Sequence, residues 1–107
     1  MISSPMIKDF QGIKILFSAY LNQDFDLMFG TADNAIHEFM QRSTSDEVSH
    51  AIYDVKRILS MKLSEEDLQN LIFQDLGACY YYSNEWTSAE FWLMHVLQML
   101  ENNFNKP

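Results

Sequence analysis

The sequence predicts an all-α fold, a single-domain antiparallel bundle of about five amphipathic helices over residues 1–107. Apolar residues recur at intervals of three and four along most of the chain, which is the spacing of one helix face. The connections between these segments are short, as in antiparallel bundles. A chain of 107 residues that is 48% hydrophobic can build one core but not two.

Two helices are predicted in the first half of the chain, over residues 6–21 and 31–42. Gly12 lies inside the first and is expected to be a tolerated weak point. Thr31 marks the start of the second. The apolar faces consist of Phe10, Ile13, Phe17, Tyr20 and Leu21 in the first helix and of Ala32, Ala35, Ile36, Phe39 and Met40 in the second.

The next two helices carry the clearest end signals. Thr44 and Glu47 have the spacing of a capping box and open a third helix, whose apolar stripe runs from Val48 to Leu59. Ser64 can cap a fourth helix, whose acidic first turn suits the positive end of the helix dipole. Gly77 is expected to end it in the left-handed conformation.

The last helix is expected to open with Thr87 and Glu90, a second capping-box pair, and to continue to about residue 100. Between it and the fourth helix, residues 78–82 favour extended structure, but no strand elsewhere could pair with them. We therefore expect a packed, extended linker. Residues 101–107 are expected to fray.

Charge is distributed unevenly along the chain, whose net charge is -8. Residues 15–41 contain four acids and no Lys or Arg, and residues 63–105 contain seven acids and again none. The remainder has four acids against seven bases, centred on Lys56, Arg57 and Lys62. Such acidic surfaces repel phosphate, so direct nucleic-acid or anionic-membrane binding is disfavoured, whereas a basic protein partner would be attracted.

No catalytic, metal or cofactor site is expected. Asp24 and Asp26 form an Asp-x-Asp pair without a third carboxylate at calcium-loop spacing, so backbone capping is the favoured interpretation. The three histidines have no metal-binding motif, although His50 lies one helical turn from Asp54. Cys79 has no flanking base and is read as a small buried hydrophobe. The chain is therefore expected not to be an enzyme.

The N-terminus lacks the features of a secretory signal, no apolar run is long enough to span a bilayer, and the single cysteine excludes an internal disulfide. These observations predict a cytoplasmic protein.

Aromatic side chains gather near the second acidic region. Tyr80, Tyr81, Tyr82 and Trp86 lie within seven positions, and Tyr and Trp are common anchors of protein interfaces. Core packing is expected for at least two of the tyrosines. Because an extended chain turns alternate residues outward, others would remain available to a partner.

Three segments resemble one family, the CdiI-type immunity proteins of bacterial contact-dependent growth inhibition systems. Residues 20–26 read Tyr-Leu-Asn-Gln-Asp-Phe-Asp, similar to the family's Tyr-Phe-His-Gln-Asp-Trp-Asp signature, with Asn22 in place of His and Phe25 in place of Trp. Residues 63–68, Leu-Ser-Glu-Glu-Asp-Leu, and 76–81, Leu-Gly-Ala-Cys-Tyr-Tyr, resemble two further segments of it. The likeness spans residues 16–100 in the same order.

The resemblance implies a cytosolic antitoxin that binds and blocks the C-terminal toxin domain of a cognate effector, commonly a nuclease. A tight complex is expected, with a dissociation constant of about 1 nM or below, and the free protein is expected to be a monomer. The residues expected to bind the toxin are Glu65, Glu66, Asp67, Asp75, Tyr82, Glu85, Trp86 and Glu90. The signature residues Gln23, Asp24, Phe25 and Asp26 are expected to hold the fold, with Phe25, Leu27 and Phe29 tucked under the helices.

Two other functions remain open from the residues alone. One is a small acidic helical adaptor or regulator of another host protein. The other is a DNA-mimic inhibitor, which requires carboxylates spaced along one exposed face at phosphate-like intervals.

Overall fold

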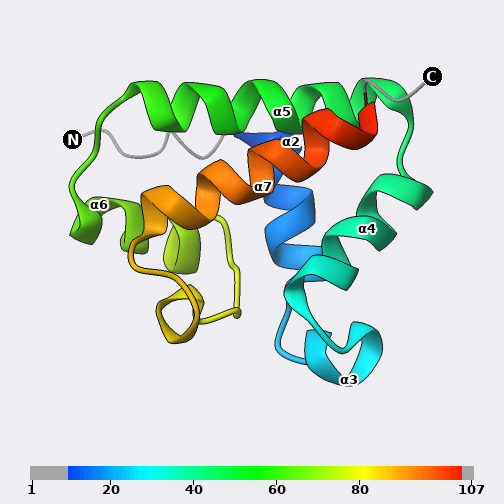
Figure 1. Ribbon diagram of the computed structural model, residues 1–107, viewed down its shortest axis with the longest axis horizontal. Coiled ribbons are helices and arrows are strands. Elements are labelled where there is room, and N and C mark those ends of the chain that lie inside the picture. The colour runs from blue at the N-terminus through cyan, green and yellow to red at the C-terminus, as the bar shows by residue number, and fades with distance from the viewer. Residues whose placement is uncertain (1–9, 105–107) are drawn as a thin grey trace.

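The computed structural model describes residues 10–104, and every regular element within them is helical (Figure 1). The elements in chain order are α2 (Gln11–Ile15), η1 (Leu16–Tyr20), α3 (Phe25–Phe29), α4 (Ala32–Arg42), α5 (Ser45–Ser60), α6 (Glu65–Asn70), η2 (Leu71–Asp75), η3 (Tyr82–Asn84) and α7 (Ala89–Phe104). The all-α prediction is confirmed. None of the helices in the described part is long and apolar enough to cross a membrane.

Two of the expected helices each consist of an α-helical part and a wider π-helical turn. α2 continues directly into η1, and α6 continues into η2. A backbone hydrogen bond closes each wider turn. The Leu21 N–H donates to the Leu16 carbonyl at 3.1 Å, and the Leu76 N–H donates to the Leu71 carbonyl at 2.8 Å. The predicted start of the first helix at residue 6 lies outside the described residues.

α5 forms one edge of the molecule, and α7 runs beside it in the opposite direction (Figure 1). α2 packs most extensively on α5, while α4 contacts both η1 and α7. Trp92 of α7 is fully buried at the centre, where it stacks on Phe17 with ring centroids 5.3 Å apart. The bundle thus buries one stripe of each long helix around this indole.

Side-chain caps fix three helix starts as predicted. Thr31 accepts the Asn34 N–H at 3.1 Å, Thr44 and Glu47 form the expected capping box, and Ser64 accepts the Asp67 N–H.

The start and the end of α7 differ from the prediction. Ser88, not Thr87, precedes the first residue of the helix, and its hydroxyl accepts the Phe91 N–H at 3.2 Å. α7 also continues to residue 104, beyond its predicted end at about residue 100. Trp92, Val96 and Leu100 keep this helix anchored in the core up to its last turns.

The linker after η2 has the extended, packed conformation that its sequence predicts. Gly77 has a φ of +79° and ends the helix, and the Cys79 N–H then bonds the Leu21 carbonyl at 2.7 Å. Ala78, Tyr80 and Tyr82 point inward, whereas Cys79 and Tyr81 are exposed. The expectation that Cys79 is buried is therefore wrong, because alternation along an extended chain turns it outward.

Residues 22–30 lie between the first two predicted helices, and the structure corrects part of the expectation that Phe25, Leu27 and Phe29 are tucked under the helices. This segment contains the short helix α3, drawn in cyan at the lower right of Figure 1. Phe25 and Phe29 pack against the core, but Leu27 is 85% exposed. A helix turns Leu27 about 200° away from Phe25, so the two side chains cannot share one face.

Candidate functional site

A hollow lies between the start of α4, α3 and the segment from Cys79 to Trp86, which we call the acidic cleft. It consists of two adjoining cavities of about 290 and 430 Å³ that share Tyr80 and Glu85 in their walls. The smaller is lined by Thr31, Ala32, Asp33, Tyr80, Glu85 and Trp86, and the larger by Gln23, Phe25, Asp26, Cys79, Tyr80, Tyr81, Asn84 and Glu85. Three carboxylates and no Lys or Arg are among these lining residues.

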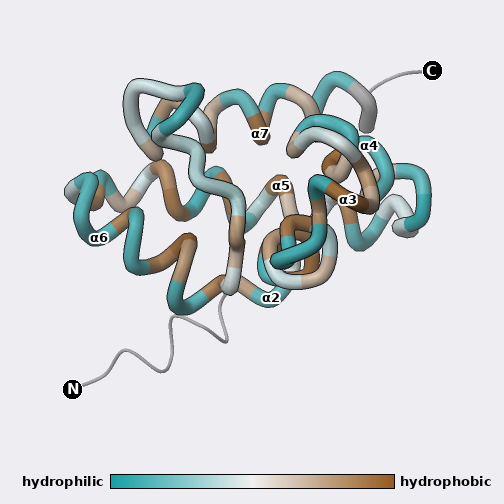
Figure 2. The backbone as a smooth tube through the Cα atoms, turned by 90° about the horizontal axis from the view of Figure 1, so that it is seen from below, coloured by the Kyte–Doolittle hydropathy of each residue, from teal (hydrophilic) through white to brown (hydrophobic). Residues whose placement is uncertain are grey.

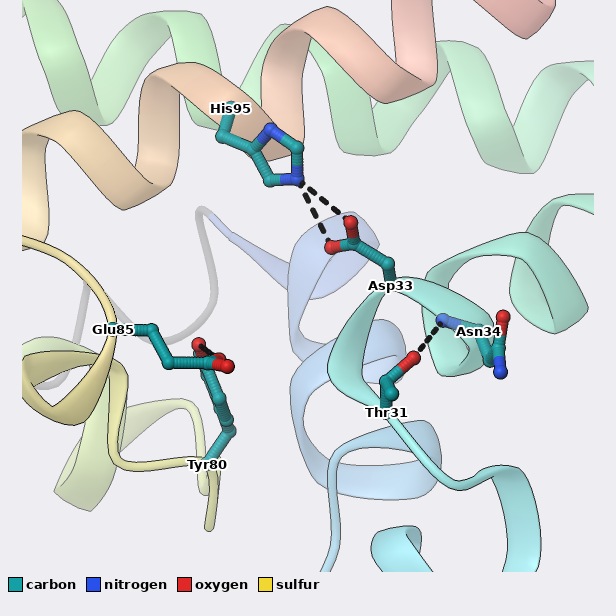
Figure 3. A network of polar contacts seen from close by, with 6 residues as sticks. All are labelled: Thr31, Asp33, Asn34, Tyr80, Glu85 and His95. Carbon is teal, nitrogen blue, oxygen red and sulfur yellow. Dashed lines mark hydrogen bonds and ion pairs between the residues drawn. The ribbon is translucent and has the colours of Figure 1, made fainter.

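α4 positions one side of the cleft. Thr31 caps this helix, so that Asp33 lies in its first turn and faces α7. There the Nε2 atom of His95 lies 3.0 Å from Asp33 Oδ1 and 3.2 Å from Oδ2. Figure 3 shows the imidazole of His95 pointing at this carboxylate. This contact joins residues 62 positions apart and holds the carboxylate at the edge of the cleft.

Tyr80 and Glu85 form the opposite side (Figure 3). The Tyr80 hydroxyl donates a hydrogen bond to Glu85 Oε1, and its ring packs edge-on against Phe25. Burial, followed by the Glu85 carboxylate, raises the pKa of Tyr80 well above its usual value, so the phenol stays protonated and donates. The tyrosine thereby fixes the direction of the Glu85 carboxylate.

Trp86 closes the cleft toward α7. Its indole lies 4.7 Å from the His95 ring, centroid to centroid, and lines both the smaller cavity of the cleft and a groove of about 780 Å³ between α5 and α7. Phe91 and Met94 are exposed along that groove. The indole therefore separates an acidic hollow from an apolar one.

The sequence-predicted binding residues are not all brought together. Glu85 and Trp86 lie in the cleft, whereas Glu66 and Asp67 are exposed in the first turn of α6. Glu90 is exposed on α7 and lines the apolar groove. Asp75 lies at the end of η2 and is partly buried, and its backbone carbonyl accepts a hydrogen bond from Lys14 Nζ at 3.2 Å.

Tyr82 is a correction to the prediction. Its side chain is 1% exposed and stacks on Trp92, so the folded chain does not present it to a partner. Tyr81 is 66% exposed instead. The aromatic cluster in the sequence predicts that one ring is exposed. Which tyrosines point inward and which point outward depends on how Gly77 ends the preceding helix.

Glu65 has an internal role that the sequence did not indicate. Its Oε1 accepts the N–H of Ala89, the first residue of α7, at 3.0 Å, and its Oε2 accepts the Tyr82 hydroxyl at 2.5 Å. One carboxylate from α6 thus connects the linker to the start of α7.

The Glu65→Ala variant should be about 1–3 kcal/mol less stable, because two partly buried donors lose their acceptor. Urea unfolding provides the measurement. Glu66→Ala is the matched control in the same helical turn and should change the free energy of unfolding by less than about 0.5 kcal/mol. Equal effects of the two substitutions would show that the Glu65 contacts are not stabilising.

Ionisation of Tyr82 should make the free energy of unfolding depend on pH in the alkaline range. Burial, followed by the hydrogen bond to Glu65, raises the pKa of Tyr82 from 10.0 to about 12. Because the folded-state pKa is higher, the stabilising effect is complete below pH 10 and is lost as the pH rises through 12. Between these values the wild type should lose roughly 3 kcal/mol relative to Tyr82→Phe in urea unfolding. A constant difference between the two proteins would contradict the raised pKa.

The signature residues divide between the cleft and the surface beside it. Gln23, Phe25 and Asp26 line the cleft, but Asp24 lies outside it and makes no side-chain cap hydrogen bond to α3. The Asp26 carboxylate accepts the Leu27 N–H at 2.9 Å. The expected backbone-bonding role is therefore seen for Asp26 and not for Asp24.

Asp33 was not selected from the sequence as a binding residue. The available signal was the acid-only stretch 15–41, to which both Asp26 and Asp33 belong. Figure 1 and Figure 2 both show α3 and α4 at the opposite end of the molecule from α6. The described residues contain no cluster of three or more His, Cys, Asp or Glu side chains that could hold a metal ion.

The fold and the cleft define a small helical protein with an acidic, aromatic-walled hollow on its surface. Comparison with known families gives a more specific result. The model of the CdiI immunity protein family matches residues 9–100, and the chain belongs to this family.

A solved structure agrees with the family assignment. The chain is similar to a chain in the crystal structure of a CdiA-CT/CdiI complex from Y. kristensenii 33638, with 30% sequence identity and a TM-score of 0.83. The match covers 86% of this chain and 98% of that chain. No curated protein matches the sequence.

Proposed function

We propose that this chain is an antitoxin that binds and neutralises the C-terminal toxin domain of its cognate contact-dependent growth inhibition effector. The similarity to a chain of a CdiA-CT/CdiI complex across nearly the whole of both chains carries this proposal. It acts by binding in the cytoplasm and not as an enzyme. The free protein is a monomer.

The toxin is a nuclease with a basic active site. A nuclease must attract phosphate, so its substrate-binding surface is usually positive, and the acidic surfaces of this chain complement it. Complementary charge would accelerate the encounter, which matters because one escaping toxin molecule is harmful. The complex is expected to have a dissociation constant of about 1 nM or below.

The acidic cleft forms the centre of the toxin interface, with Glu85 and Trp86 at its core. Asp26 and Asp33 extend the negative surface on one side, and Tyr81 supplies an exposed ring at the rim. Glu66, Asp67 and Glu90 would contribute to the outer, solvent-exposed part. Tyr82 supports the interface from within, and the exposed Glu65 accepts the hydrogen bond of its hydroxyl.

Growth rescue tests the function. The effector C-terminal domain encoded immediately upstream is expressed inducibly with this chain, with an unrelated immunity protein, or with neither. Growth restored by this chain alone would support cognate neutralisation. Continued killing in the presence of soluble, folded protein would refute it for that toxin. A nuclease assay on the purified toxin, with and without this chain, separately tests the toxin's activity.

A further inference from the structure

We infer that the smaller cavity of the acidic cleft is a binding site for the guanidinium group of one arginine side chain from the partner protein. The inference rests on the proposed function, because the toxin is the partner. It specifies which chemical group enters the cleft and which residues hold it. Asp33 and Glu85 would accept its hydrogen bonds, and Trp86 and Tyr80 would pack along its plane and stem.

Both carboxylates are preorganised before a partner arrives. His95 holds Asp33 from the α7 side, and the side chain of Asp33 is still 53% exposed. Tyr80 donates to Oε1 of Glu85, and Glu85 is itself exposed. A carboxylate has about four lone-pair positions, so each retains acceptor capacity toward the cavity. Preorganised groups lose little side-chain entropy on binding.

The charge in the cavity is not compensated by a cation of this chain at its walls. Asp33 and Glu85 both line it, Asp26 lines the adjoining cavity, and no Lys or Arg is among the lining residues. The imidazole of His95 is not among the lining residues, and it contacts Asp33 from the direction of α7. A partner cation would therefore gain attraction from both walls.

The aromatic walls favour arginine over lysine. Trp86 is half-buried, with its ring fixed beside His95, and Tyr80 is buried with its ring held between Phe25 and Trp92. A planar guanidinium stacks on such rings and presents five donors that can reach two separate carboxylates. An ammonium is a compact, strongly hydrated charge that would lose more hydration in a cavity of about 290 Å³.

Association and dissociation rates of the toxin complex test the site. Asp33→Asn and Glu85→Gln each remove one charge and keep an acceptor oxygen for the internal hydrogen bond. Asp46→Asn, on the exposed first turn of α5, changes the net charge by the same amount outside the cleft. The two cleft variants should dissociate at least about tenfold faster, whereas the control should keep the wild-type dissociation rate, because local contacts act mainly on dissociation.

A double-mutant cycle identifies the partner group. Single alanine substitutions of the toxin's arginines and lysines are measured against wild type and Glu85→Gln. The inference is supported if replacing one arginine weakens the affinity for Glu85→Gln much less than it weakens the affinity for wild type. Coupling to a lysine instead, or dissociation rates of both cleft variants within about twofold of wild type, would overturn it. Absence of any complex with the wild-type chain would refute the proposed function itself.

Discussion

Replacing Gly12 by alanine is expected to lower the free energy of unfolding by roughly 2–3 kcal/mol. A Cβ atom at this position would lie 2.8 Å from Asp54 Oδ2 and 2.9 Å from the His50 carbonyl carbon, which belongs to the backbone of α5. The backbone cannot swing aside as a long side chain can, so α2 would have to move away from α5. For a domain of this size the melting temperature should fall by roughly 10 °C or more.

The control for Gly12 separates packing from helix propensity. Ala19 is exposed on the continuation of the same helix, and Ala19→Gly measures the cost of glycine alone, about 1 kcal/mol. Propensity by itself would make Gly12→Ala stabilising by a similar amount. A higher melting temperature for Gly12→Ala would therefore show that α2 can move away from α5 without loss of stability. Thermal unfolding followed by circular dichroism distinguishes these results.

Gly12 also shows where prediction from the sequence failed. A glycine within a helical pattern was interpreted as a weak point, because helix propensity is a local property. Its actual role depends on α5, which approaches from about 40 residues away in the chain. The cap residues Thr31, Thr44 and Ser64 were predicted correctly because the groups they bond lie three residues away.

The acidic cleft could be predicted only in its parts. The charge distribution marked both acid-only stretches, and the signature segment marked Gln23 to Asp26. Nothing local in the chain indicates that Asp26 and Asp33 lie across a hollow from Glu85, more than 50 positions later. That arrangement follows from the linker crossing the end of η1, where the Cys79 N–H bonds the Leu21 carbonyl.

Substitution of Asp54 should have the second large effect on the free energy of unfolding. It is a buried carboxylate, 0% exposed, whose Oδ2 accepts the N–H of Ile13 at 3.1 Å. Ile13 lies in the first turn of α2, where N–H groups have no partner within the helix, and the preceding Phe10 supplies no side-chain cap. Asp54 on α5 therefore caps α2 from a distance.

The Asp54→Ala variant is expected to unfold with a free energy about 2–3 kcal/mol lower than Asp54→Asn, because only asparagine keeps an oxygen for the buried Ile13 N–H. Urea unfolding of both variants at the same pH is the measurement. The asparagine variant also removes the charge, so this comparison separates the loss of the buried, hydrogen-bonding side chain from the loss of the charge. Equal stability of the two variants would mean that the distant cap does not contribute.

The pH dependence then distinguishes the charge from the hydrogen bond. Burial raises the pKa of Asp54 above its ordinary 3.8, against the opposing effects of the Ile13 hydrogen bond and the charges of His50 and Arg57. Because the folded-state pKa is raised, the contribution of Asp54 to the free energy of unfolding is fully present below pH 3.8. This contribution is lost as the pH rises through the folded-state pKa. Wild type should therefore lose stability relative to Asp54→Asn as the pH is raised from 3.5 to 7.

His50 requires its own control, because its Nε2 lies 3.8 Å from Asp54 Oδ1 and its charge lowers the pKa of that carboxyl. The comparison of aspartate with asparagine is therefore repeated in a His50→Gln background. If wild type gained stability over Asp54→Asn on raising the pH in both backgrounds, the hydrogen bond and neighbouring charges would outweigh burial. The ionised carboxylate would then stabilise the contact between α2 and α5 instead of weakening it.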